Sequence, residues 1–177
     1  MKIGIVIINW NGLNLLKKYL NEIILNSDNS TVYIIDNNSS DESILYVREN
    51  YKEVKIISLD KNYGFAEGYN KGLKEVEENY VCIINNDILV TKDWLDPIRK
   101  KFKKDPESII QPTILDINNT EYFEYAGASG GFIDKYGYPF CRGRIFDTIE
   151  KDNGQYNDSK IFWASGACFF ISKNIFN

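Results

Sequence analysis

The chain has 177 residues, of which 44% are hydrophobic and 14% aromatic, enough to build the core of one globular domain. Its formal net charge is −4, which argues against a general nucleic-acid-binding protein, and it contains no histidine. The lack of histidine excludes Ser-His and Cys-His nucleophiles and histidine-bound zinc, so any general base is expected to be a carboxylate.

The first predicted elements are a strand over residues 2–9 and an amphipathic helix. Leucines and isoleucines recur at helical spacing from Leu13 onward. The connection, residues 9–12 (NWNG), contains one glycine, whereas the dinucleotide-binding fingerprint needs G-x-G-x-x-G at this place. An NAD-dependent dehydrogenase is therefore disfavoured.

A second strand, residues 31–35, ends at Asp36. Ser39 and Glu42 have the spacing of a capping box, which predicts a helix from there to about Tyr51. A carboxylate at the end of a strand can accept hydrogen bonds from a nucleotide base or a ribose, whereas the plainer alternative is a turn. For Asp36 we favour the binding role.

A third strand, residues 54–59, leads to a helix that begins near Gly64. Gly64, Gly68 and Gly72 are four residues apart and line one side of that helix, although each glycine costs about 1 kcal/mol of helix stability relative to alanine. Close packing of the helix on the sheet and close approach of a ligand explain them equally well. The free amides near Gly64 also suit a diphosphate.

The strand over residues 80–85 contains an unbroken apolar run, which predicts burial on both faces of a parallel sheet. It ends in Asn85, Asn86 and Asp87. Because ligands bind beyond the carboxyl ends of such strands, Asp87 is placed to hold a divalent cation against phosphate oxygens. An ordinary β-turn is the alternative.

Residues 94–104 are predicted to form a helix, with Pro97 tolerated in its first turn. Its basic side chains predict a solvated face, with an anionic membrane surface as the alternative partner. They are Arg99, Lys100, Lys101, Lys103 and Lys104. A further strand is predicted over residues 109–111.

From Asn118 onward, many aromatic residues and glycines predict short strands and loops. Aromatic faces suit sugar rings, but small hydrophobic clusters beneath loops have the same composition. Residues 162–171 read as a strand that is broken by a kink at Ser165, Gly166 and Ala167. Such small residues leave room for a bulky group beside them.

In this order the segments resemble the family-2 glycosyltransferases of GT-A fold, in particular the rhamnosyltransferase-like branch that builds surface polysaccharides. The resemblance covers nearly the whole chain. It rests on residues 7–12 (IINWNG), 36–41 (DNNSSD), 62–70 (NYGFAEGYN), 85–87 (NND) and 163–167 (WASGA). It implies an α/β fold with a mainly parallel, Rossmann-like sheet flanked by helices. Residues 1–117 would form the nucleotide-sugar-binding half, and residues 118–177 would begin a β- and loop-rich acceptor-side half, incomplete at its C-terminus.

The resemblance also implies roles for single residues. The expected nucleotide-binding residues are Ile8, Asn9, Trp10, Asp36, Asn38, Asn62, Gly64 and Asn86. Asp87 would meet the diphosphate and a divalent cation, Mg²⁺ or Mn²⁺, although the family's fuller metal motif begins with Asp where this chain has Asn85. Ser165, Gly166 and Ala167 would line the donor-sugar and acceptor pocket. The family's catalytic base belongs to an acidic motif that follows, so it is expected beyond Asn177, and the chain as given is expected to be a truncated enzyme that binds donor but is inactive.

The expected function is therefore inverting transfer of a sugar from a nucleotide-diphosphate donor to a glycan or lipid-linked acceptor. The alternatives are a noncatalytic nucleotide- or carbohydrate-binding module and a nucleotidyltransferase, although the glycine-rich phosphate loop of the latter is missing between Asn9 and Leu13. No nucleic-acid partner is expected. Peripheral contact with a membrane and formation of a homodimer are expected. Three cysteines without C-x-x-C spacing and no apolar run near ~20 residues predict a cytoplasmic protein. A place at the inner face of the membrane is a separate expectation that goes with the peripheral membrane contact.

Overall fold

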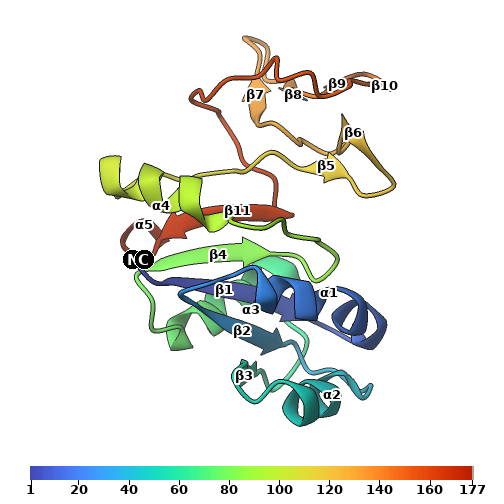
Figure 1. The fold of residues 1–177 in the computed structure, drawn as a ribbon, viewed down its shortest axis with the longest axis vertical. Coiled ribbons are helices and arrows are strands. Elements are labelled where there is room, and N and C mark those ends of the chain that lie inside the picture. Colours follow the sequence, from blue (N-terminus) through green and yellow to red (C-terminus); the bar gives the residue numbers. More distant parts are fainter. Residues whose placement is uncertain (177) are drawn as a thin grey trace. The chain divides into compact units, whose positions relative to one another are not determined.

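The apolar runs predicted as buried strands form the centre of one five-stranded sheet, in the order β11-β4-β1-β2-β3 (Figure 1). The computed structural model describes residues 1–176. The strands are β1 (Ile3–Asn9), β2 (Ser30–Asp36), β3 (Lys55–Ser58), β4 (Tyr80–Ile84) and β11 (Cys168–Ser172). β1 pairs in parallel with β2 and β4, and β2 pairs in parallel with β3. Figure 1 shows β11 running the opposite way, so the sheet is mainly parallel, as predicted.

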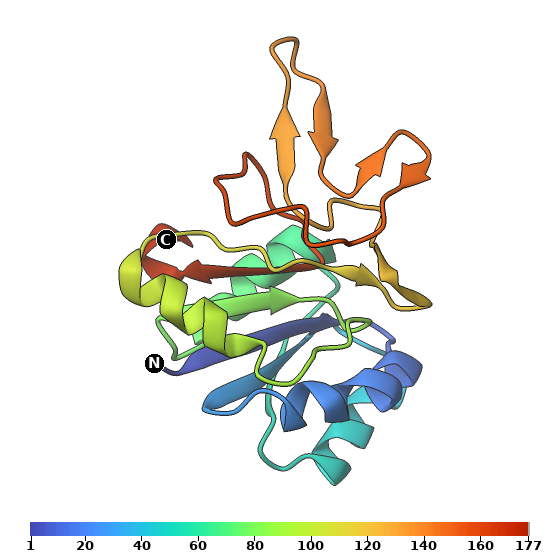
Figure 2. The same ribbon diagram turned by 45° about the horizontal axis from the view of Figure 1, so that its top comes forward.

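Helices cover both faces of this sheet. They are α1 (Leu13–Leu25), α2 (Ser43–Asn50), α3 (Gly64–Gly72) with the 3-10 turn η1 (Leu73–Glu75) and α4 (Leu95–Lys104), while the short α5 (Lys173–Phe176) follows β11 and buries no residue. Figure 2 shows α1 and α4 on one face and α3 on the other. α4 buries Leu95, Ile98 and Phe102, and Pro97 lies in its first turn, as predicted. No helix within residues 1–176 is long and apolar enough to cross a membrane.

α3 packs unusually close to the sheet, and its glycines allow this. A β carbon at Gly68 would lie 2.4 Å from Ile8 Cδ1, and one at Gly72 would lie 2.3 Å from Ile35 Cδ1. For these two glycines the helix–sheet packing explanation is confirmed. Gly64 differs, because nothing lies within 4 Å of its β position and its φ of +72° is the left-handed conformation that glycine adopts readily.

Two local predictions are wrong. The capping box does not form, because α2 begins at Ser43 with no side-chain cap from Glu42, while the Ser39 hydroxyl accepts from Asn9 and from a backbone amide instead. The Asp41 carboxylate takes the capping place and accepts from the Ser43 amide at 3.0 Å. Residues 109–111 form no strand, and only an isolated bridge marks the segment. The other predicted strand ends agree within two residues, except that the strand predicted over residues 162–171 begins only after the small-residue kink, as β11 at Cys168.

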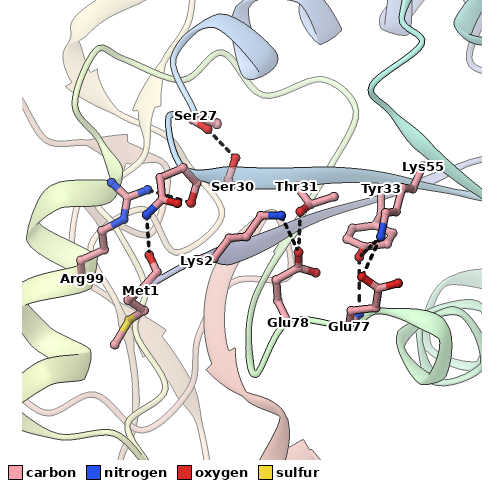
Figure 3. Close-up of polar contacts among 11 residues, drawn as sticks. Met1, Lys2, Ser27, Ser30, Thr31, Tyr33, Lys55, Glu77, Glu78 and Arg99 are labelled. Atoms are coloured by element: carbon pink, nitrogen blue, oxygen red, sulfur yellow. Dashed lines mark hydrogen bonds and ion pairs between the residues drawn. The ribbon is translucent and has the colours of Figure 1, made fainter.

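The basic residues of α4 do not form one solvated face, as Figure 3 shows for Arg99. The Arg99 guanidinium donates to the backbone carbonyls of Asp28 and Asn29 and therefore holds the turn before β2 against the helix. Lys100, Lys101, Lys103 and Lys104 are exposed. The solvated-face prediction thus holds for the lysines and is wrong for Arg99.

The amino-terminal edge of the sheet carries a buried carboxylate, that of Glu78 (Figure 3). Glu78 accepts from the Thr31 hydroxyl and forms an ion pair with Lys2 at 3.6 Å. Burial by itself raises the pKa of Glu78, but hydrogen bonds from Thr31 and Tyr33 outweigh it, so the pKa lies below its ordinary value. The ionised form of Glu78 therefore stabilises this edge.

The chain divides into two units, and the sheet just described, apart from the first two residues of β11, belongs to the first, Met1–Ser108 with the described residues from Phe170 onward. The second unit, Ile109–Phe169, contains three two-stranded antiparallel sheets. Its strands are β5 (Leu115–Asp116), β6 (Asn119–Phe123), β7 (Gly131–Ile133), β8 (Pro139–Cys141), β9 (Arg144–Ile145) and β10 (Thr148–Ile149). The predicted short strands and loops are confirmed, whereas the halves 1–117 and 118–177 stay a prediction.

Candidate functional site

The loops that follow four parallel strands begin side by side at the carboxyl edge of the sheet. The strand register pairs Asn9, the end of β1, with Asp36, the end of β2, and it pairs Ile7 with Ile84, the end of β4. The register of β2 with β3 pairs Asp36 with Ser58. This edge is where open α/β sheets bind ligands.

Asn9, the buried last residue of β1, hydrogen-bonds to two of these loops. Its side chain is 1% exposed, and its Nδ2 donates to the hydroxyls of Ser39 at 3.2 Å and Ser43 at 2.9 Å. Its Oδ1 accepts from Asn86 Nδ2 at 3.4 Å, and its backbone carbonyl accepts from the Asn37 amide at 2.8 Å. Asn9 therefore ties the loops after β2 and β4 to the end of β1.

Asp36 and Asn38 both shape the loop after β2. Asp36 is buried, and its Oδ1 accepts from the Ser39 amide at 2.9 Å. Asn38 has φ +63°, a left-handed conformation in which asparagine is enriched. The turn that was the alternative for Asp36 is thus present. Contact of either side chain with a base or ribose stays a prediction.

Asn37, which the sequence analysis missed, connects the loops after β2 and β3. It is 3% exposed, and its Nδ2 donates to Asn62 Oδ1 and to the Gly64 carbonyl, both at 2.9 Å. Its Oδ1 accepts from the Tyr63 amide at 2.9 Å, while Asn62 Oδ1 also accepts from the Gly64 amide at 2.8 Å. The signal that could have found Asn37 is that an asparagine follows or ends each of the four parallel strands.

Asp87 stands at the other end of this edge, in a turn with Asn86. The turn predicted as the plainer alternative is therefore present, and within it Asp87 is exposed while Asn85 and Asn86 are half-buried. Within residues 1–176, no three carboxylate or thiol groups gather to hold a metal ion. A single exposed carboxylate fits Mg²⁺ or Mn²⁺ only when phosphate oxygens and water supply the other ligands.

The first strand contributes Ile8 and Trp10 in different ways. Trp10 is 58% exposed, so its ring is open to a ligand. The Ile8 amide donates to the Tyr69 hydroxyl at 3.2 Å, and that hydroxyl donates to the Ile84 carbonyl at 3.1 Å. The Tyr69 hydroxyl thus connects β1 and β4 just below the edge, and Ile8 takes part in this connection only through its backbone amide.

The amino terminus of α1 borders an open hollow of about 450 Å³. It is lined by Asn11, Gly12, Leu13, Asn14, Leu15 and Asp41. Asp41 Oδ2 accepts from the Leu13 amide at 3.0 Å. Burial by itself raises the pKa of Asp41, but this bond and those from Ser43 outweigh it and lower the pKa. A carboxylate therefore already occupies the helix end that an anionic ligand would need.

Ser165, Gly166 and Ala167 belong to the second unit. The Ser165 amide donates to Gln111 Oε1 at 2.7 Å, and Gln111 Nε2 donates to the Gly127 carbonyl at 2.6 Å. Ser165 is buried, whereas Gly166 is exposed. Gln111, which the sequence analysis did not single out, holds the Ser165 turn in place. The predicted contact of Ser165, Gly166 and Ala167 with sugar stays a prediction.

Comparison with known proteins gives matches over nearly the whole chain. The family model for Glycosyl transferase family 2 matches residues 4–177. Polypeptide N-acetylgalactosaminyltransferase 4 of Caenorhabditis elegans is 24% identical over 152 residues, which cover 82% of this chain and 25% of that protein. The chain thus spans about a quarter of the length of this curated relative.

Two solved structures share the fold. A mannosyltransferase from Pyrobaculum calidifontis, in complex with GDP-Man and Mn²⁺, has TM-score 0.58 and 19% identity over 63% of this chain and 35% of its own. S. aureus TarS 1-349, in complex with UDP-GlcNAc, has TM-score 0.61 and 17% identity over 74% of this chain and 39% of its own. The predicted GT-A α/β fold is therefore confirmed. Because the family model spans all five strands of the sheet and both units, the chain belongs to glycosyl transferase family 2.

Proposed function

We propose that this protein binds a nucleotide-diphosphate sugar at the carboxyl edge of its parallel sheet. The observation that carries the proposal is that Asn9 and Asn37 join the loops of four strands into one polar edge, which runs from the Asp87 turn to the Gly64 turn. The proposal is supported by the shared fold of two proteins that were solved with GDP-Man and UDP-GlcNAc. We further propose that the donor binds together with a metal ion and that transfer of the sugar inverts its anomeric configuration. The proposed acceptor is a glycan or a lipid-linked acceptor in surface polysaccharide synthesis.

In this proposal the described residues bind and orient the donor. Asp36, Asn38 and Asn62 bind the base and ribose, and the exposed ring of Trp10, the residue that follows β1, is open to stacking. Asp87 holds Mg²⁺ or Mn²⁺ against the diphosphate, where the cation neutralises charge on the leaving group. Asp87 is suited to this because it is an exposed oxygen ligand at a strand end.

Transfer also needs a base that takes the proton of the acceptor hydroxyl while its oxygen attacks the anomeric carbon opposite the diphosphate. That base is predicted beyond Asn177, outside the described residues. Since general base catalysis contributes about 10²- to 10⁴-fold, donor binding is a sharper test of this chain than turnover.

Calorimetry with UDP, TDP and GDP, each with Mn²⁺ and with Mg²⁺, tests the proposal. Binding of at least one nucleotide that weakens when EDTA removes the metal supports it, and preference for TDP supports the rhamnosyltransferase-like branch. Failure of all three to bind refutes it. A noncatalytic binding module predicts binding without transfer in the full-length protein, and a nucleotidyltransferase predicts pyrophosphate release from a nucleoside triphosphate.

The metal role of Asp87 has its own test. Asp87→Ala should weaken nucleotide binding in Mn²⁺ and leave the weak binding in EDTA unchanged. The matched control is Glu107→Gln, which removes an exposed negative charge after α4 and should bind as the wild type does. An unchanged affinity of Asp87→Ala in Mn²⁺ would remove Asp87 from the proposed role.

Three further expectations stay predictions. They are a cytoplasmic location at the inner face of the membrane, peripheral contact with that membrane through the α4 lysines, and a homodimer. Vesicle flotation with anionic lipids tests the second, and sedimentation equilibrium tests the third.

A further inference from the structure

We infer that four asparagines form a positioning device that sets the distance between the Asp87 turn and the Gly64 turn. We call Asn86, Asn9, Asn37 and Asn62 the asparagine chain. They follow or end β4, β1, β2 and β3, so they stand in the order of those strands in the sheet. The inference rests on the proposed function, because the two turns are the ends of the proposed donor site.

Hydrogen bonds connect the asparagine chain without a break. Asn86 Nδ2 donates to Asn9 Oδ1 at 3.4 Å, and the Asn37 amide donates to the Asn9 carbonyl at 2.8 Å. Asn37 Nδ2 then donates to Asn62 Oδ1 at 2.9 Å. Asn86 lies beside Asp87, and Asn62 accepts from the Gly64 amide, so the bonds link one turn to the other.

The two middle members are too buried and too fully bonded to bind a ligand directly. Asn9 is 1% exposed and Asn37 is 3% exposed. In each side chain both the amide nitrogen and the carbonyl oxygen already have protein partners. We therefore assign Asn9 and Asn37 as positioning residues, although the sequence analysis expected Asn9 to touch the nucleotide.

Glycines leave room for these two amides. A β carbon at Gly12 would lie 2.2 Å from Asn9 Oδ1 and 2.6 Å from Asn86 Nδ2. A β carbon at Gly68 would lie 3.4 Å from Asn37 Nδ2. Asn9 and Asn37 are buried and hydrogen-bonded through both side-chain polar atoms, so the middle of the network is rigid, and rigidity lowers the cost of ordering the site when a ligand binds.

The role predicts a particular loss in Asn37→Ala. A nucleoside diphosphate spans both turns, whereas Mn²⁺-pyrophosphate touches only the Asp87 turn and the nucleoside only the loops after β2 and β3. If the asparagine chain sets the distance between the turns, the diphosphate should bind about tenfold more weakly to the variant, Mn²⁺-pyrophosphate should change by less than about twofold, and the nucleoside should lose less affinity than the diphosphate. Calorimetry measures the binding of three probes, which are the nucleoside diphosphate that the wild type binds best, its nucleoside and Mn²⁺-pyrophosphate.

Thr31→Val is the matched control. Thr31 lies in β2, the strand that leads to Asn37, but at the opposite edge of the sheet, where its buried hydroxyl donates to Glu78. Removing that hydrogen bond should lower the unfolding midpoint and leave the affinity for the diphosphate within about twofold. Both variants are measured at a temperature at which circular dichroism shows them folded.

Three results would overturn the inference. They are wild-type affinity in folded Asn37→Ala, an equal loss for the fragments and the diphosphate, and an equal loss in Thr31→Val. If Asn37→Ala does not fold, Asn37→Asp replaces it, because it keeps the acceptor for the Tyr63 amide and removes the donor to Asn62. A wild-type protein that binds no nucleoside diphosphate refutes the proposed function itself, so the two failures are distinguishable.

Discussion

Replacing Gly72 by alanine should destabilise the protein even though alanine is the better helix former. Gly72 is the last residue of α3, and a β carbon there would lie 2.3 Å from Cδ1, 2.5 Å from Cγ1 and 3.0 Å from Cγ2 of Ile35. Ile35 is fully buried in β2, so its side chain has no open space to move into. Overpacking of this kind costs about 1–3 kcal/mol, whereas the gain in helix propensity is at most about 1 kcal/mol. Three contacts at or below 3.0 Å place the packing cost in the upper part of its range, about 2–3 kcal/mol, so it exceeds the gain in helix propensity and leaves a net loss of about 1–2 kcal/mol.

Urea denaturation followed by circular dichroism measures this loss, and a double-mutant cycle with Ile35→Val tests its cause. Ile35→Val removes Cδ1, the atom nearest to the new methyl group, and by itself should cost about 0.5–1.5 kcal/mol. In the Gly72→Ala background the removed atom relieves the clash, so the double variant should be more stable than the sum of the single losses predicts. A Gly72→Ala variant as stable as the wild type, or strictly additive losses, would refute the reasoning.

Three other variants test separate contacts. Burial raises the pKa of Glu78, but hydrogen bonds from two hydroxyls of β2 lower it by more, so the pKa lies below its ordinary value of 4.5. The ionised carboxylate therefore stabilises the folded protein, and this stabilisation should be lost as the pH falls below about 4.5. In Glu78→Gln the urea midpoint should depend less on pH. Tyr69→Phe should cost about 1–3 kcal/mol in urea denaturation, because it removes the acceptor of the half-buried Ile8 amide and the donor of a buried hydrogen bond to the Ile84 carbonyl. Gln111→Ala should speed hydrogen exchange at the Ser165 amide, measured by mass spectrometry, and unchanged exchange would contradict its role.

Strands and helices could be predicted because their signals are local. The run that became β4 is apolar throughout and was correctly expected to be buried on both faces, and the predicted helix with Pro97 in its first turn is α4. The prediction of a strand over residues 109–111 was wrong because so short an apolar run before a proline does not by itself decide between a strand and another conformation.

Side-chain partners were harder to predict than elements. Ser39 has the spacing of a capping residue, but its hydroxyl is used by Asn9, which is 30 positions away in the chain. Arg99 looks like one of five basic surface residues, yet the turn at Asp28 supplies carbonyls that hold its guanidinium. In both cases a distant segment offered a better partner than the local one.

The sequence by itself determined the order of the elements, the strand-end position of Asp36 and Asp87, and the resemblance to family-2 glycosyltransferases. Only the tertiary structure decided which polar side chains hold the edge together. Asn9 and Asn86 are 77 positions apart, and their amides meet because β1 and β4 are neighbours in a parallel sheet whose register pairs Ile7 with Ile84. Periodicity along a chain reports burial, whereas a hydrogen bond between loops depends on strand order and register, which no single segment encodes.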